Sequence, residues 1–189
     1  IEAEVDVLRK MGIGFKCGVE VGRDITIEQL RQQGYKAFYI AIGAQGGRKL
    51  GIAGEDADGV IAGVEFLKKI NPDEKSAHIK GRTVVVGGGN VAVDVARTAL
   101  RAGASEVTMV CLEDRASMPA AKDEIEEALE ENITINNSWG PKEILTAGGK
   151  VTGIVFRKCT AVRDAQGRFN PQYDENDTMT IECDNVLVS

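Results

Sequence analysis

The sequence has little that would suit a metal site, a membrane span or a nucleic-acid interface. Its four cysteines (Cys17, Cys111, Cys159 and Cys183) form no Cys-x-x-Cys pair, so neither a redox dithiol nor a zinc or iron–sulfur centre is indicated. The single histidine, His78, lies in a polar connector and is not indicated as a catalytic base. The net charge of −6 and the pI of about 5.0 make nucleic acid and anionic membranes poor partners.

The sequence also lacks an apolar run long enough to cross a bilayer, and it shows no signal peptide. We therefore expect no membrane association and a cytoplasmic location. The chain has 189 residues, of which 43% are hydrophobic and 28% charged, which suits a globular α/β protein with a sizeable core. It begins at Ile1 without a methionine and stops inside an apolar run at 185–188, so we expect a piece of a longer protein.

The central motif follows a β-branched run at residues 83–86. It consists of Gly87, Gly88, Gly89, Asn90, Val91 and Ala92, which form the pattern G-x-G-x-x-A. In a dinucleotide-binding fold Gly87 allows the tight turn, Gly89 lets a pyrophosphate approach the backbone, and Ala92 lets the helix lie close to the strand. A helix over about residues 90–102 would direct its N-terminal N–H groups at the phosphates. We predict that these six residues bind a dinucleotide.

An acidic residue follows the next expected strand, at residues 106–112. This residue, Glu113, lies about twenty positions beyond Ala92, where a carboxylate binds the hydroxyls of the adenosine ribose. The alternative is a glycine turn in an α/β sheet that binds nothing. The agreement of strand, turn, helix, second strand and acid favours the nucleotide site.

The rest of the chain predicts further elements of an α/β fold. Helices are expected over residues 2–10, 27–32 and 62–70, and strands over 13–17, 19–21, 36–42, 133–135 and 185–188. Thr26 with Gln29 has the form of a capping box for the second helix. Three β-branched stretches, 139–145, 151–162 and 178–183, predict an antiparallel meander whose last two strands are joined by a loop around 166–177. We therefore predict a Rossmann-like, three-layer dinucleotide-binding domain with a small antiparallel β-meander.

A family resemblance rests on motifs in a fixed order. They are A-I-G-A at 41–44, R-x-L-x-I-x-G-E-D at 48–56, G-V at 59–60, G-G-G-N-V-A-V-D-V-A-R at 87–97, M-P-A at 118–120 and E-C-D-N-V-L-V-S at 182–189. Together they resemble the small-chain (β-subunit-like) glutamate synthases and related NAD(P)H-dependent flavoproteins of the pyridine nucleotide–disulfide oxidoreductase architecture.

The resemblance implies that an FAD domain is split by an inserted NAD(P)H domain. Residues 1–80 would be a partial FAD-binding domain and connector, 81–180 the NAD(P)-binding domain, and 181–189 the start of a returning FAD-domain strand. Gly43 and Ala44 match the second segment that contacts FAD in this family. The first FAD fingerprint is missing, so we expect that this chain alone does not hold FAD tightly and is inactive.

The implied chemistry is hydride transfer between a nicotinamide cofactor and FAD, and onward to an iron–sulfur domain or subunit outside this chain. This step needs no general acid or base, and we nominate no catalytic residue. Many members of the family carry paired arginines where this chain has Leu112 and Glu113. A carboxylate repels a 2′-phosphate, which predicts NAD(H) over NADP(H), while Arg115 could still contact a phosphate or the adenine face.

Two other functions are compatible with the pattern. A self-contained NAD-linked dehydrogenase would need a catalytic Tyr-Lys or His-Asp arrangement, which the sequence does not show convincingly. A non-catalytic NAD-binding or subunit-docking module would bind the coenzyme without electron transfer. The residues identify neither the terminal electron acceptor nor the oligomeric state, and a homodimer stays open.

Overall fold

The structure is a computed structural model that describes residues 2–44, 46–47, 49–70 and 79–189. It divides the chain into two compact units, Ile1–Gly43 and Ala44–Ser189. The predicted nucleotide motif lies in the second unit, whereas His78 and Arg48 lie outside the described residues. Among the described residues, no helix is both long and apolar enough to span a bilayer.

The first unit contains two short helices, α1 (Glu2–Lys10) and α2 (Ile27–Gln32). The capping box at the start of α2 is confirmed. The Thr26 hydroxyl accepts a hydrogen bond from the Gln29 backbone N–H at 3.2 Å, and the Gln29 carboxamide accepts one from the Thr26 N–H at 2.8 Å. These reciprocal bonds satisfy two N–H groups that the helix itself leaves free.

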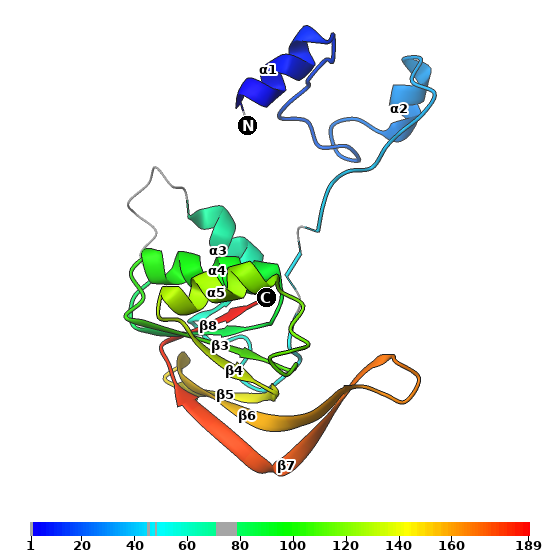
Figure 1. Ribbon diagram of the computed structural model, residues 1–189. Coiled ribbons are helices and arrows are strands. Elements are labelled where there is room, and N and C mark those ends of the chain that lie inside the picture. Colours follow the sequence, from blue (N-terminus) through cyan, green and yellow to red (C-terminus); the bar gives the residue numbers. More distant parts are fainter. Residues whose placement is uncertain (1, 45, 48, 71–78) are drawn as a thin grey trace. The chain divides into compact units, whose positions relative to one another are not determined.

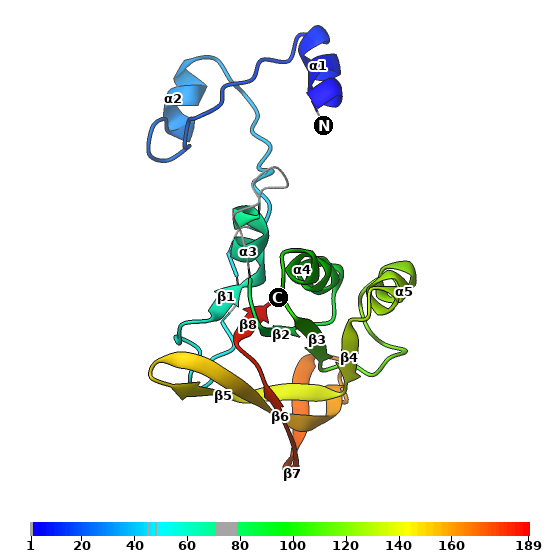
Figure 2. The ribbon, with the colours of Figure 1, turned by 90° about the vertical axis from the view of Figure 1, so that its left-hand side faces the viewer.

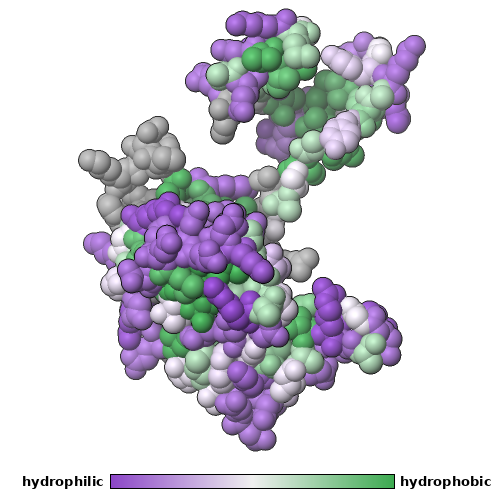
Figure 3. Space-filling view, in the orientation of Figure 1, coloured by the Kyte–Doolittle hydropathy of each residue, from purple (hydrophilic) through white to green (hydrophobic). Residues whose placement is uncertain are grey.

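The strands expected at 13–17, 19–21 and 36–42 are absent, so these predictions are wrong. In the last of these segments the side chains of Tyr39 and Ile40 are 94% and 76% exposed. A strand is stabilised by backbone hydrogen bonds to a neighbouring strand, and the structure describes no strand beside these segments. Figure 3 accordingly shows hydrophobic residues on the surface of this unit.

The second unit is built on a five-stranded parallel sheet. Its strands are β1 (Val60–Ala62), β2 (Arg82–Val86), β3 (Glu106–Cys111), β4 (Thr134–Asn137) and β8 (Asn185–Val188), in the order β1-β8-β2-β3-β4. The chain runs outward from β2 to β4 on one side and returns to β8 on the other. The order of the strands therefore reverses between β2 and β8, which is where ligands bind in open α/β sheets.

Helices cover one face of this sheet and a second sheet covers the other (Figures 1 and 2). The helices are α3 (Gly63–Lys69), α4 (Asn90–Arg101) and α5 (Lys122–Glu130). The second sheet is the antiparallel meander of β5 (Trp139–Ala147), β6 (Lys150–Arg163) and β7 (Phe169–Glu182). The predicted α/β fold with a small antiparallel sheet is confirmed, and the meander is its third layer.

Alternation along the central strands separates two hydrophobic cores. On β2, Val85 packs into the core beneath the helices, whereas Val84 and Val86 pack into the core against the meander. The second core also contains Ile154 and Phe156 of β6, both 0% exposed. Full burial of each such side chain contributes about 1.5–3 kcal/mol, so the meander is fixed to the parallel sheet by its inner face.

Strand β7 is longer than predicted, because it includes most of the expected loop at 166–177. This stretch is polar, and cross-strand contacts with β6 hold it in the sheet. The Arg157 guanidinium lies 3.9 Å from the centre of the Tyr173 ring and forms an ion pair with Glu175. Such pairs stabilise strands whose own β-propensity is low.

The predicted division of the chain places β8 at the start of a returning FAD-domain strand. In the structure β8 lies between β1 and β2 in the five-stranded parallel sheet. β1 itself was not predicted; it is three residues long and follows a glycine-rich connector. The division into cofactor domains at residues 80 and 180 stays a prediction.

The cysteines differ in their environment from one another. Cys17 is exposed, whereas Cys111, Cys159 and Cys183 are buried. Burial raises the pKa of the Cys111 thiol to about 11 and that of Cys183 to about 12. These two thiols are therefore protonated at neutral pH and are poor nucleophiles.

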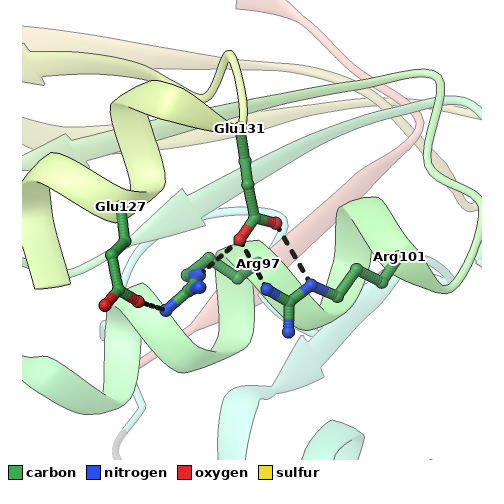
Figure 4. Close-up of polar contacts among 4 residues, drawn as sticks. All are labelled: Arg97, Arg101, Glu127 and Glu131. Atoms are coloured by element: carbon green, nitrogen blue, oxygen red, sulfur yellow. Dashed lines mark hydrogen bonds and ion pairs between the residues drawn. The ribbon is translucent and has the colours of Figure 1, made fainter.

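Four charged side chains join α4 to the end of α5 (Figure 4). Glu131, which caps α5, accepts hydrogen bonds from Arg97 Nε at 2.7 Å and from Arg101 Nε at 3.2 Å, and Glu127 pairs with Arg97. Bonds from Arg101 and Arg97 hold the pKa of the Glu131 carboxyl below its ordinary value. Glu131 therefore stabilises the fold above the ordinary carboxyl pKa, and this contribution is lost as the pH falls through the lowered pKa.

We expect Glu131→Gln to lower the free energy of unfolding at about pH 7 by about 1 kcal/mol or less, the size typical of partly exposed ion pairs. At a pH below the lowered pKa, where the wild-type carboxyl is protonated, the two proteins should unfold at nearly the same urea concentration. Urea unfolding at the two pH values measures this. Glu130→Gln, at an exposed neighbouring position that forms no ion pair with the described residues, serves as the matched control. An equal loss in the free energy of unfolding at both pH values would contradict an ionic contribution from Glu131.

Candidate dinucleotide site

The glycine loop joins β2 to α4 and leaves the start of the helix open. Gly89 is the N-cap of α4, with φ −91° and ψ 175°, and its carbonyl accepts the first helical bonds from Ala92 and Val93. A Cβ built on Gly89 would meet no described atom within 4 Å. The first-turn N–H groups and the positive end of the helix dipole therefore face space that an anion can occupy.

The other small residues of the motif, Gly87, Gly88 and Ala92, lie in close contact with neighbouring segments. Gly87 has a φ of 151°, and a Cβ there would lie 2.6 Å from the Ser189 carbonyl oxygen and 3.1 Å from the Ala92 Cβ. Ala92 is 1% exposed, so its methyl group fills the contact between the loop and α4. A Cβ on Gly88 would lie 2.9 Å from the Cys111 Cβ. Larger residues at Gly87 and Gly88 would thus displace the ends of β8 and β3.

A cavity of about 530 Å³ lies at the carboxyl ends of β8, β2 and β3, where the strand order reverses. We call it the crevice. Gly87, Gly88, Glu113 and Ser189 are among the residues that line it. The location and the glycine-lined wall suit the diphosphate and the adjoining sugar of a dinucleotide.

Glu113 lines this crevice, and hydrogen bonds to its backbone carbonyl fix its position. Its Oε2 lies 3.1 Å from the Cβ position on Gly88. Its carbonyl accepts hydrogen bonds from the Ser138 N–H at 2.9 Å and from the Asn137 side chain at 3.2 Å. Ser138 adopts a φ of 65°, which turns the chain from β4 into β5 at this point. The end of β4 therefore fixes the position of the predicted ribose-binding acid.

The remaining predicted site residues lie in different places. The Asn90 side chain accepts a hydrogen bond from the Ala121 N–H at 2.8 Å, so it ties the segment before α5 to the glycine loop. Val91 is 48% exposed on the first turn of α4. Arg115 reaches the Met118 sulfur at 4.0 Å and does not line the crevice. Of these three side chains, that of Asn90 joins two segments of the fold by a hydrogen bond.

Gly43 and Ala44, the predicted FAD contacts, stand where the two compact units meet in the sequence. Gly43 has a φ of 65°, which only glycine adopts easily. The strand expected before them is absent, and the assignment of Gly43 and Ala44 as FAD contacts stays a prediction.

One wall of the crevice, supplied by the meander, was not predicted from the sequence. Trp139, Phe169 and Tyr173 line it, as do Lys49 and Leu50 of the connector. Trp139 starts β5 directly after β4 ends, so its place near the carboxyl edge of the sheet could have been inferred from the strand order. Phe169 and Tyr173 fell within the predicted loop and carried no such signal.

Comparison with known proteins identifies relatives along the whole chain. The pyridine nucleotide-disulphide oxidoreductase family matches residues 4–189. The chain is 34% identical over 194 residues to the NADP(+)-dependent formate dehydrogenase subunit beta of Moorella thermoacetica, covering 99% of this chain and 27% of that protein. It is 33% identical over 196 residues to the glutamate synthase [NADPH] small chain of Escherichia coli, covering 97% of this chain and 41% of that protein.

Solved structures agree on the fold. The structure of Mycobacterium tuberculosis FprA in complex with NADPH superposes with a TM-score of 0.74 at 23% identity, covering 90% of this chain and 53% of FprA. The chain spans about a quarter to two fifths of the length of the curated relatives named above. The predicted family resemblance is confirmed: the chain belongs to the pyridine nucleotide-disulphide oxidoreductase family, whose members are pyridine nucleotide-dependent flavoprotein enzymes.

Proposed function

We propose that this chain is the nucleotide-binding part of a flavoprotein oxidoreductase and binds the coenzyme in the crevice at Gly87–Gly88–Gly89. The observation that carries the proposal is the open N-terminus of α4 beside a cavity of about 530 Å³ at the reversal of strand order. The helix N–H groups would bind the diphosphate, and Glu113 would accept hydrogen bonds from the adenosine ribose.

The chemistry proposed for the full-length protein is hydride transfer between the nicotinamide and FAD. This chain's residues bind and orient the coenzyme, and the aromatic wall at Trp139 and Tyr173 excludes water from one side of the crevice. No side chain of the crevice is assigned a proton transfer. Because several relatives are named as subunits or small chains, we further propose an iron–sulfur partner domain or subunit outside this chain.

For the coenzyme we propose NADP(H). Glu113 alone predicted NAD(H), but relatives whose names specify a coenzyme are NADP(+)- or NADPH-dependent, and these names weigh against that prediction. The 2′-phosphate of NADP(H) then needs a positive charge that offsets Glu113, because like charges at short range are unfavourable.

The test uses the full-length protein and two readouts. Trp139, the single tryptophan of this sequence, lines the crevice, so bound NADPH should quench its fluorescence. Anaerobic addition of NADPH should then bleach the visible absorbance of the flavin. Binding without bleaching would support the alternative, a non-catalytic nucleotide-binding or docking module. Absence of saturable coenzyme binding would show that the proposal is wrong.

A further inference from the structure

The crevice continues past Glu113 into a second cavity. This cavity, of about 380 Å³, shares Leu112, Glu113 and Phe169 with the crevice. We call it the hairpin cavity because the end of β6 and the start of β7 line it. If the diphosphate lies at the glycine loop and the ribose at Glu113, the adenosine extends into the hairpin cavity. Phe169, 63% exposed, presents an aromatic ring where the two cavities join.

Three charged side chains line the hairpin cavity, namely Glu113, Asp114 and Arg163. Asp114 is already engaged, because its Oδ1 accepts hydrogen bonds from the hydroxyl and the backbone N–H of Ser117, each at 2.8 Å. Arg163 donates through one Nη to the Gly167 carbonyl at 2.9 Å. In the part of the chain that the structure describes, Arg163 forms no ion pair. Its charge is therefore the positive charge available to a ligand here.

The turn that follows β6 holds Arg163 at the cavity. Asp164 accepts hydrogen bonds from the backbone N–H groups of Gln166 and Arg168 and pairs with the Arg168 guanidinium at 2.8 Å. Arg168 is thus neutralised within the turn, whereas Arg163, one residue before Asp164, is not. The two arginines lie five residues apart and differ in their ion-pairing, which makes them a natural comparison.

We infer that Arg163 is a specificity-determining residue that binds the 2′-phosphate of NADP(H) in the hairpin cavity. This inference rests on the proposed function. The position after β3 offers Leu112 and Glu113 and no cation, and Arg115 lines neither cavity. A guanidinium has free N–H donors arranged to match phosphate oxygens, and it would offset the Glu113 carboxylate. The meander therefore supplies the charge that the parallel sheet lacks.

The test compares Arg163→Gln with Arg168→Gln in the full-length protein by calorimetric titration with NADP⁺ and NAD⁺. We expect Arg163→Gln to raise the dissociation constant for NADP⁺ about tenfold and to change that for NAD⁺ by less than about twofold, because one charge-assisted contact is lost. Arg168→Gln should change neither. Wild-type protein should also bind adenosine 2′,5′-bisphosphate more tightly than AMP, and Arg163→Gln should remove most of that difference.

Two outcomes would overturn the inference while the proposed function stands. One is a wild-type protein that binds both coenzymes and an Arg163→Gln variant with unchanged affinity for NADP⁺. The other is an equal loss of NADP⁺ and NAD⁺ affinity, which would show that Arg163 acts on the fold of the hairpin. Failure of the wild-type protein to bind either coenzyme would instead show that the proposed function is wrong, and the assignment of Arg163 with it.

Discussion

Replacing Gly89 by serine is expected to raise the dissociation constant for the coenzyme about 100-fold and to leave the fold as stable as before. Gly89 has extended backbone angles that serine adopts readily, and a Cβ there meets no described atom within 4 Å. Serine is a favoured N-cap whose hydroxyl accepts from the first-turn N–H groups of a helix. The serine hydroxyl would therefore occupy the place of the diphosphate and accept hydrogen bonds from the N–H groups of α4 that would otherwise bind it.

The expected size follows from the bonds that the diphosphate would lose. Two charge-assisted hydrogen bonds of about 1.5 kcal/mol each amount to about 3 kcal/mol, or about 100-fold in affinity. Quenching of Trp139 fluorescence measures the binding, and urea unfolding measures the stability. Gly14→Ser is the matched control, because Gly14 also has open space at its Cβ and lies in the first unit. Undiminished affinity in Gly89→Ser would show that the helix N-terminus does not bind the coenzyme.

The sequence predicted the glycine loop because its determinants are local. A β-branched run, small residues at fixed spacing and a helix lie within about twenty residues, and each constrains the backbone next to it. The structure accordingly has β2, the open N-cap at Gly89 and the buried Ala92 where they were expected. Glu113 was predicted in the same way, from its distance along the chain from Ala92.

What the sequence could not predict depends on pairing between distant segments. The place of β8 between β1 and β2 joins Val186 to Val84, about one hundred residues earlier, and no local pattern specifies that neighbour. The apolar pattern of residues 36–42 predicts a strand only if a partner strand is present beside it. β7 shows the reverse case: its polar residues suggested a loop, but contacts with β6, such as Tyr173 over Arg157, keep it in the sheet.

The same dependence explains why half of the candidate site was missed. The crevice has a local wall, the glycine loop, and a distant wall from the meander that carries Trp139, Phe169 and Tyr173. The distant wall is positioned by the second core, where Phe156 and Ile154 pack against β2 and β8. Only the packed structure shows that Arg163 and Glu113 line one cavity.

Replacing Glu113 by glutamine is expected to shift the ratio of the NAD⁺ and NADP⁺ dissociation constants about 30-fold in favour of NADP⁺. The neutral amide removes a like-charge repulsion from the 2′-phosphate, and it accepts hydrogen bonds from the ribose hydroxyls of NAD⁺ more weakly. At about 1 kcal/mol for each effect, the sum is about 2 kcal/mol. The backbone at Glu113 stays in place because Ser138 and Asn137 bind its carbonyl.

Calorimetric titration of the full-length protein with each coenzyme, repeated at rising salt, tests this expectation. The shift should shrink as salt screens the charge of residue 113, whereas a change of shape would not respond to salt. Glu106→Gln, at the opposite end of β3, removes the same charge away from the crevice and should leave the ratio unchanged. If Glu113→Gln altered the affinity for both coenzymes equally, the carboxylate would not discriminate between them. In the double variant Glu113→Gln/Arg163→Gln, the shift in the ratio of the two dissociation constants should be smaller than in Glu113→Gln alone. The two charges act in opposite directions on the same phosphate.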